Sequence, residues 1–208
     1  MSDAAAIRTS LTTRAALASV ATAVFLLGLK AYAVWATGSV AMLGSLTDTL
    51  LDVVASLITL LGVRVAAMPA DRDHRFGHGK AESIAALVQV GIIAVSAIGI
   101  GWRAVDRLID GERTANAEYG IAVSVVAIAA TFALIGYQRS VIRRTASVAI
   151  RTDNVHYQSD LLLNLAVIAA LALDQYAGLT GADPLFGIAI AAWLLFGAWR
   201  ASLHAVDQ

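Results

Sequence analysis

The fold of this protein is decided by one apolar stretch, Val40–Ala66, which reads VAMLGSLTDTLLDVVASLITLLGVRVA. A transmembrane helix needs about 20 predominantly apolar residues, and this stretch is longer than that. It nevertheless carries two acids, Asp48 and Asp52, whose spacing of four residues puts them on one face of a helix. An ionisable side chain near the middle of a membrane helix costs roughly 2.5–3.5 kcal/mol, so such a residue is by default functional. The stretch predicts a membrane helix with a functional acidic face.

A second apolar stretch, Val148–Leu173, repeats this pattern with His156 and Asp160. If the two helix faces meet, they bring together three carboxylates and one imidazole, a ligand set suited to zinc or a neighbouring divalent ion. The alternative is that the acids pair with buried basic residues. Away from the ends of the apolar stretches the only basic residue is Lys30, which is one charge against three aspartates. We therefore predict a metal site with four ligands, namely Asp48, Asp52, His156 and Asp160.

Composition places the whole chain in the same class. Of its 208 residues, 59% are hydrophobic and 14% are charged, and the mean hydropathy is +0.74, values typical of a membrane protein. We predict an all-α membrane protein, with one domain over residues 1–208 that has six transmembrane helices. The predicted spans are Ala15–Ala36, Val40–Ala66, Ile84–Trp102, Ile121–Tyr137, Val148–Leu173 and Leu185–Trp199.

Basic residues are distributed unevenly between the connections of these spans. Most Lys and Arg residues fall on the side that would hold the two termini, and the opposite side has only Arg103, Arg107 and Arg113. Positively charged segments tend to stay in the cytoplasm, so both termini are predicted to be cytoplasmic. The second and fifth spans then cross in opposite directions, and their polar pairs can lie at similar depth.

Composition and local motifs also argue against several functional classes. A net charge of zero without a basic, aromatic-rich tract argues against nucleic acid as a partner, and the absence of cysteine removes disulfides and thiolate metal ligands. No histidine is followed by glutamate, as a zinc protease would require, and nothing flanking Asp48 or Asp160 supports an aspartyl protease. We predict no enzyme activity and no cofactor. A proton-coupled exporter of organic cations stays the alternative, although 7% aromatic residues offer little for an aromatic-lined pocket.

A second polar cluster lies in the connection between the second and third spans, where residues 71–82 read DRDHRFGHGKAE. Asp71, His74 and His78 could close around a second ion as one carboxylate and two imidazoles, because the two glycines let the backbone fold back. The alternative is a solvated basic loop whose histidines bind nothing, and Asp73 competes with Asp71 as a ligand. Spacing alone leaves both interpretations open.

Three motifs together resemble those of a known family, the cation diffusion facilitators. They are SLTDTLLD at residues 45–52, DHRFGHGKAES at residues 73–83 and DNVHYQSD at residues 153–160. The family's bacterial zinc, cadmium and ferrous-iron efflux branch consists of six-span transporters driven by proton exchange, and the resemblance extends from Ala15 to Asp207. It implies a homodimer in the bacterial inner membrane that exports Zn²⁺, also Cd²⁺, with Fe²⁺ as a further candidate.

Residue by residue, the resemblance implies two metal sites and one charge pair. The transport site would consist of Asp48, Asp52, His156 and Asp160, and the loop site would consist of Asp71, His74 and His78. In this family an Asp-Asp pair facing a His-Asp pair is associated with zinc and cadmium, whereas four carboxylates are associated with manganese. The charge pair of close relatives would correspond to Lys80 and Asp207.

Members of this family usually continue into a cytoplasmic ferredoxin-like domain that binds metal and helps two copies dimerise. The present sequence stops at Gln208, directly after the sixth predicted span. We therefore expect a member that lacks this C-terminal domain, either naturally short or truncated.

A transport mechanism can be argued from the chemistry of the ligands. Metal ligands must be deprotonated, so loading a cation releases protons, and protonation weakens the site. An unperturbed imidazole titrates at about pH 6.5, which places His156 between cytoplasmic and acidic external pH. We expect the ion to enter from the cytoplasm and to be expelled outside by protons. Asp153, about one turn before His156, is expected at a solvated helix end.

Overall fold

The computed structural model describes residues 3–37, 40–72, 74–75, 77–110, 117–177 and 182–206. This part of the chain forms six α-helices and contains no strand, which confirms the predicted all-α class. The helices are α1 (Asp3–Thr37), α2 (Val40–Ala66), α3 (Lys80–Asp110), α4 (Ala117–Thr145), α5 (Val148–Ala177) and α6 (Ala182–Val206).

The two prolines of the chain lie where they do not interrupt a helix. Pro69 follows the end of α2, and Pro184 lies in the first turn of α6. A proline is tolerated in the first turn because the backbone N–H that it lacks would have no partner within the helix. Each helix can therefore run without a break along the bundle.

The helices extend beyond most of the predicted spans, whereas α2 has the predicted bounds. In the described residues, four segments are long and apolar enough to cross a membrane: Ala6–Ala36, Asp48–Ala66, Lys80–Asp106 and Ala122–Thr145. The apolar part of α6, Leu185–Arg200, is shorter. The first half of helix α5 is rich in polar side chains, and these build the candidate site described below.

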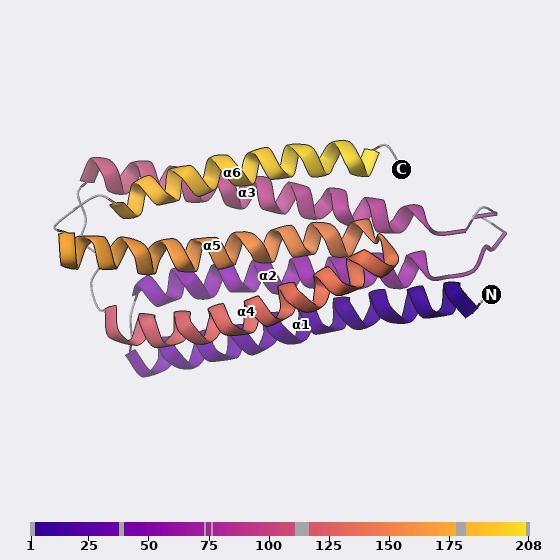
Figure 1. Cartoon of the computed structure of the whole chain (residues 1–208), viewed down its shortest axis with the longest axis horizontal. Coiled ribbons are helices and arrows are strands. Elements are labelled where there is room, and N and C mark those ends of the chain that lie inside the picture. Colours follow the sequence, from indigo (N-terminus) through magenta and orange to yellow (C-terminus); the bar gives the residue numbers. More distant parts are fainter. Residues whose placement is uncertain are drawn as a thin grey trace.

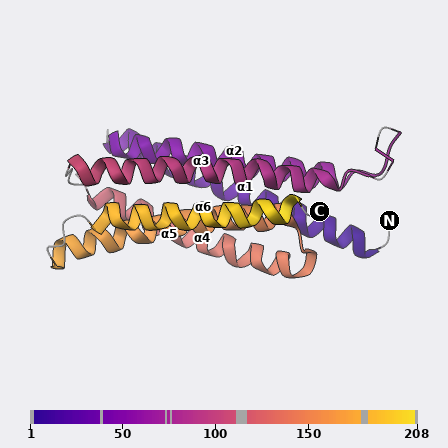
Figure 2. The same ribbon diagram turned by 90° about the horizontal axis from the view of Figure 1, so that it is seen from above.

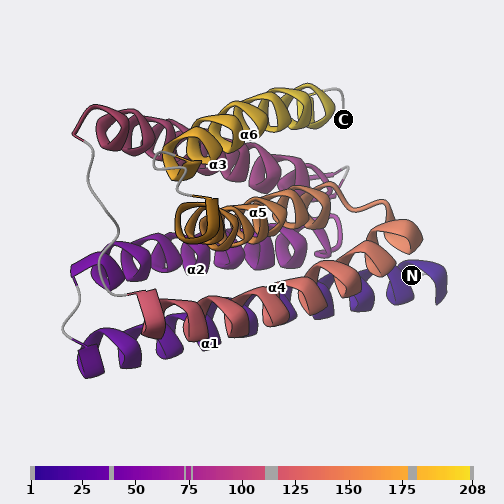
Figure 3. The same cartoon turned by 60° about the vertical axis from the view of Figure 1, so that its left-hand side comes forward.

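The six helices run roughly along one long axis (Figures 1 and 2). The start of α1, the end of α6 and the residues between α2 and α3 lie at one end of the bundle, which we call the terminal end. The start of α2, the end of α3 and the start of α6 lie at the opposite end, which we call the far end (Figures 1 and 3). Helix α5 contacts all five other helices, so its polar side chains face partners from every part of the bundle.

Small residues allow the helices to pack closely. A Cβ atom added to Gly62 of α2 would collide with Ala85 of α3, so these two helices approach each other closely at this point. By contrast, large apolar side chains point outward, for example Val95 with 70% and Trp102 with 76% of their surface exposed. An outer surface of this kind matches a lipid environment rather than water.

Candidate metal site between helices α2 and α5

Three of the four predicted ligands converge in the interior of the bundle. One ligand atom from each of Asp52, His156 and Asp160 lies within 4.8 Å of the other two. Nε2 of His156 is 3.0 Å from Oδ1 of Asp52 and 3.9 Å from Oδ2 of Asp160. His156 is buried and both carboxylates are largely so. Two carboxylates and one imidazole at this spacing could hold one divalent ion and leave a fourth position open.

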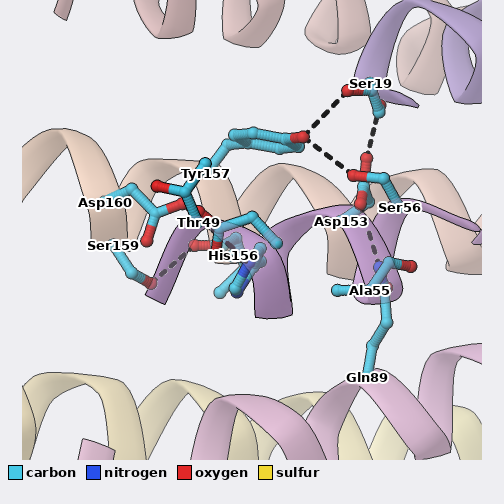
Figure 4. A network of polar contacts seen from close by, with 12 residues as sticks. Ser19, Thr49, Ala55, Ser56, Gln89, Asp153, His156, Tyr157, Ser159 and Asp160 are labelled. Atoms are coloured by element: carbon cyan, nitrogen blue, oxygen red, sulfur yellow. Dashed lines mark hydrogen bonds and ion pairs between the residues drawn. The ribbon is translucent and has the colours of Figure 1, made fainter. Parts of the chain in front are cut away.

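The spacing that suggested this site also explains how the helices build it. His156 and Asp160 are one turn apart on α5, and both point to the same face (Figure 4). Asp52 reaches them from α2. Because α5 contacts α2 directly, two local helix faces become a single cluster.

The fourth predicted ligand, Asp48, lies outside this cluster and forms an ion pair. Oδ1 of Asp48 is 3.3 Å from Nη2 of Arg103, and Oδ2 is 3.4 Å from Nη1. Arg103 belongs to α3 and lies just beyond the predicted third span, so a search for basic partners within the apolar stretches did not include it. The pair is half-exposed, with 54% of the Asp48 and 61% of the Arg103 side chain accessible.

Two cavities connect the cluster with Asp48. One, of about 280 Å³, is lined by Asp48, Asp52 and Asp160 together with Lys30 and Arg103. The other, of about 250 Å³, is lined by the same three acids, His156 and Arg103. Both also include residues toward the end of α3. Both cavities therefore extend from the cluster toward the far end of the bundle.

Lys30 contributes positive charge to the first cavity without an ion pair. Its Nζ donates to Oγ1 of Thr49 at 2.6 Å and to the carbonyl of Ser45 at 3.4 Å. Among the residues that the structure describes, it contacts no aspartate. Its charge therefore acts on the acids through space only.

Asp153 lies on the terminal side of the cluster and is fully buried, so the expected solvated helix end was wrong. Its carboxylate accepts hydrogen bonds from Ser19 Oγ at 2.6 Å and Gln138 Nε2 at 2.7 Å. It also accepts from Gln89 Nε2 at 2.9 Å and Thr59 Oγ1 at 3.3 Å. These donors come from α1, α4, α3 and α2, because the start of α5 is enclosed by the other helices.

Tyr157 extends this network toward the cluster. Its hydroxyl donates to the carbonyl of Ser19 at 3.0 Å and shares a 2.8 Å hydrogen bond with Ser56. Figure 4 shows Asp153, Ser19 and Ser56 together on one side of Tyr157, with His156 and Asp160 on the other. We call Asp153, Tyr157 and the side chains that hydrogen-bond to them the polar layer. No side chain of this layer lines either cavity. The layer separates the cluster from the terminal end.

The sequence contained a signal for the polar layer that spacing arguments did not use. Ser19, Gln89 and Gln138 are polar residues inside otherwise apolar stretches, and each is completely or almost completely buried. A buried polar group needs a hydrogen-bond partner. Such residues could have been marked as members of a network, although not assigned to Asp153.

The predicted loop residues also come together. Asp71 Oδ2 lies 3.4 Å from Nε2 of His78, and its Oδ1 lies 3.5 Å from Nδ1 of His74. The backbone N–H of His74 donates to Asp71 Oδ1 at 2.6 Å. Gly77 has φ = 83°, a left-handed conformation that favours glycine and turns the chain between the two histidines. The three side chains could hold a second ion.

Two other predicted participants are not placed in these sites. Asp73, the alternative loop ligand, lies outside the described residues. Lys80 is exposed at the start of α3, and its predicted partner Asp207 also lies outside them. The Lys80–Asp207 charge pair stays a prediction.

The chain is similar to known proteins over almost its whole length. Residues 16–208 match the family described as the cation efflux transmembrane domain. The chain belongs to this family. It is 46% identical over 198 residues to the cation-efflux pump FieF of Cronobacter sakazakii. The proteins of the same name from Pectobacterium carotovorum and Escherichia fergusonii are 44% and 45% identical over the same length.

Each of these matches covers 95% of the chain and 66% of the relative, so the chain spans about two thirds of the length of these relatives. The resemblance inferred from the three motifs is thereby confirmed. Because the family consists of membrane transporters of cations, the protein is not an enzyme, as predicted.

Proposed function

We propose that the protein exports divalent metal cations from the cytoplasm in exchange for protons. Zn²⁺ is the principal substrate, with Cd²⁺ and Fe²⁺ as further ones. The observation that carries this proposal is the convergence of Asp52, His156 and Asp160 from α2 and α5. Imidazole and carboxylate are ligands that Zn²⁺ accepts, and imidazole is less suited to Mg²⁺ or Ca²⁺. Zinc sites are usually four-coordinate, so a fourth ligand has to come from Asp48 or from water.

The proposed topology has all six helices crossing the bacterial inner membrane, with both termini in the cytoplasm. The start of α1 and the end of α6 lie at the same end of the bundle, as an even number of crossings requires. The excess of Lys and Arg at that end supports a cytoplasmic location. Helix α5 can cross despite its polar residues because they face the interior of the bundle, where they find partners.

Proton exchange follows from the chemistry of the ligands. The metal binds deprotonated carboxylate and neutral imidazole, so protons and metal compete for Asp52, His156 and Asp160. A higher proton concentration outside therefore promotes release there. Export then requires that the site opens alternately to the two sides.

The cavities and the polar layer support the alternating-access part of the proposal. The cluster is reached from the far end through the cavities and is closed toward the terminal end by the hydrogen bonds of Asp153 and Tyr157. In the proposed topology this is the state that faces outward. Loading from the cytoplasm would require α5 to move relative to the helices that donate to Asp153.

The loop cluster is proposed as a second metal site at the cytoplasmic end. The donor atoms of Asp71, His74 and His78 lie within 4.8 Å of one another, which supports this assignment. The homodimer stays a prediction from the resemblance.

The proposal is tested by metal transport into proteoliposomes that contain a zinc-sensitive dye, with an imposed pH gradient. The native chain is compared with Asp52→Ala and His156→Ala, and with Asp106→Ala as a control that removes an exposed acid from α3. We expect zinc flux that depends on the gradient, is lost in both site variants and is retained in the control. If the folded native chain moves neither Zn²⁺ nor Cd²⁺, the proposal is wrong. Movement of organic cations by such a chain would favour the alternative.

A further inference from the structure

The ion pair between Asp48 of α2 and Arg103 of α3 involves one of the four predicted metal ligands. Both terminal nitrogens of Arg103 face both carboxylate oxygens of Asp48, at 3.3 and 3.4 Å. This planar, two-point geometry is characteristic of arginine with a carboxylate and differs from a point contact with lysine. Arg103 also lines both cavities that lead to Asp52 and Asp160.

The three acids around the cavities differ in the charged groups that they contact. Asp52 and Asp160 share the imidazole of His156, whereas Lys30 donates to a hydroxyl and a carbonyl. Asp48 is therefore the cavity acid that is held by a permanently charged side chain. It is also the acid that is missing from the cluster of three ligands. In the position where Arg103 holds it, Asp48 is not among the acids whose donor atoms lie within 4.8 Å of one another. To become the fourth ligand of an ion at this cluster, Asp48 therefore has to turn away from Arg103.

We propose that Arg103 is a tethered cation that competes with the metal ion for Asp48. In the empty site it neutralises Asp48. When an ion binds, Asp48 turns to the ion and Arg103, repelled by the cation, turns away from it, and re-formation of the pair favours release. This inference rests on the proposed function and adds to it a residue that sets metal affinity and the rate of release.

The exposure of the pair makes this competition physically reasonable. More than half of each side chain is accessible, and an ion pair with such exposure is weak. A divalent cation can displace a weak pair, whereas a fully buried pair would hold the acid permanently. The expected effect of removing the competitor is accordingly modest, roughly two- to fivefold in metal affinity.

The test measures Zn²⁺ binding to the purified full chain by competition with a fluorescent chelator, and Zn²⁺ release by stopped flow. All variants carry His74→Ala and His78→Ala, so that the loop does not contribute. We expect Arg103→Gln to bind Zn²⁺ roughly two- to fivefold more tightly and to release it more slowly. Arg103→Lys should stay closer to the parent because it keeps the charge. Arg103→Met is a second neutral variant in case Arg103→Gln does not fold.

Two controls separate this mechanism from a general effect of charge. Arg139→Gln removes the same charge from an exposed position on α4 and should leave binding unchanged. In an Asp48→Asn background, Arg103→Gln should have no further effect, because its competition acts through Asp48. If the neutral Arg103 variants bind zinc no more tightly than the Arg139→Gln control, the inference is wrong and the proposed site stands. If the parent binds no zinc, the proposed function is wrong and the inference falls with it.

Discussion

Asp52 of α2 and His156 of α5 lie 3.0 Å apart, between Oδ1 and Nε2, although 104 positions separate them in the chain. The site is thus shared by two helices instead of being carried by one. Any movement of α5 relative to α2 changes the distance between ligands, and with it the affinity for an ion. If the proposed site is correct, this relationship links metal binding to the arrangement of the bundle.

Removal of either member of this pair should weaken metal binding strongly. Asp52→Asn and His156→Gln keep the approximate size of the side chain, but each replaces a proposed metal ligand. Loss of a residue that only supports a ligand already lowers metal affinity about tenfold or more. We therefore expect zinc affinity at the intramembrane site to fall by more than roughly tenfold. Titration calorimetry of the purified chain measures this. Ser159→Ala is the matched control, because Ser159 lines the cavity while its hydroxyl donates to the carbonyl of Val155. An unchanged affinity in both ligand variants would contradict the site.

The preference for Zn²⁺ over Mn²⁺ should depend on the imidazole of His156. His156→Asp converts the ligand set to carboxylates only, which favours harder ions such as Mn²⁺ over Zn²⁺. We expect the ratio of zinc to manganese affinity to fall in this variant relative to the native chain. Competition between the two ions for the purified protein measures the ratio. An unchanged ratio would show that selectivity is set elsewhere.

Loss of the buried carboxylate of Asp153 should destabilise the bundle. Asp153→Ala removes the acceptor that Ser19, Gln138 and Gln89 share. Each of these donors has a second acceptor nearby, so the loss comes from the charged hydrogen bonds, which contribute about 1.5–3 kcal/mol each. We expect a clear drop in the thermal unfolding midpoint in detergent. Asp106→Ala, at an exposed position of α3, should unfold like the native chain. A native-like midpoint for Asp153→Ala would mean that the donors find other partners.

Close contact between α2 and α3 should be sensitive to a single methyl group. A Cβ atom at Gly62 collides with Ala85, so Gly62→Ala is expected to cost about 1–3 kcal/mol through overpacking. The double variant Gly62→Ala with Ala85→Gly should recover much of this loss. Gly91→Ala is the control, since nothing lies within 4 Å of a Cβ added there. The thermal unfolding midpoints of the native chain, Gly62→Ala, the double variant and Gly91→Ala test this prediction. Equal midpoints for Gly62→Ala and Gly91→Ala would contradict it.

The loop cluster should account for a second bound ion. Replacing His78 by alanine removes one of three donor groups that lie close together, so we expect zinc stoichiometry to fall from two ions per chain to one. Equilibrium dialysis with metal analysis measures this number. Arg72→Ala, an exposed residue of the same loop, should keep both ions. Retention of two ions by His78→Ala would favour the solvated-loop interpretation.

Local pattern in the sequence determined much of the fold. Apolar stretches predicted six helices, and for α2 they predicted both ends. Spacing of four residues placed His156 and Asp160 on one helix face. The short separations within the loop likewise predicted that Asp71, His74 and His78 can meet, and they do. These features depend on neighbours along the chain, so the sequence contains them directly.

The tertiary structure alone decided the partners across helices. Asp48 shares a helix face with Asp52, yet it pairs with Arg103, because α3 brings a guanidinium within reach at that depth. Asp153 is buried instead of solvated because four helices surround it with donors. Periodicity specifies which way a side chain points on its own helix. Which group it meets is set by the packing of several helices, a property that spacing along one chain segment does not contain.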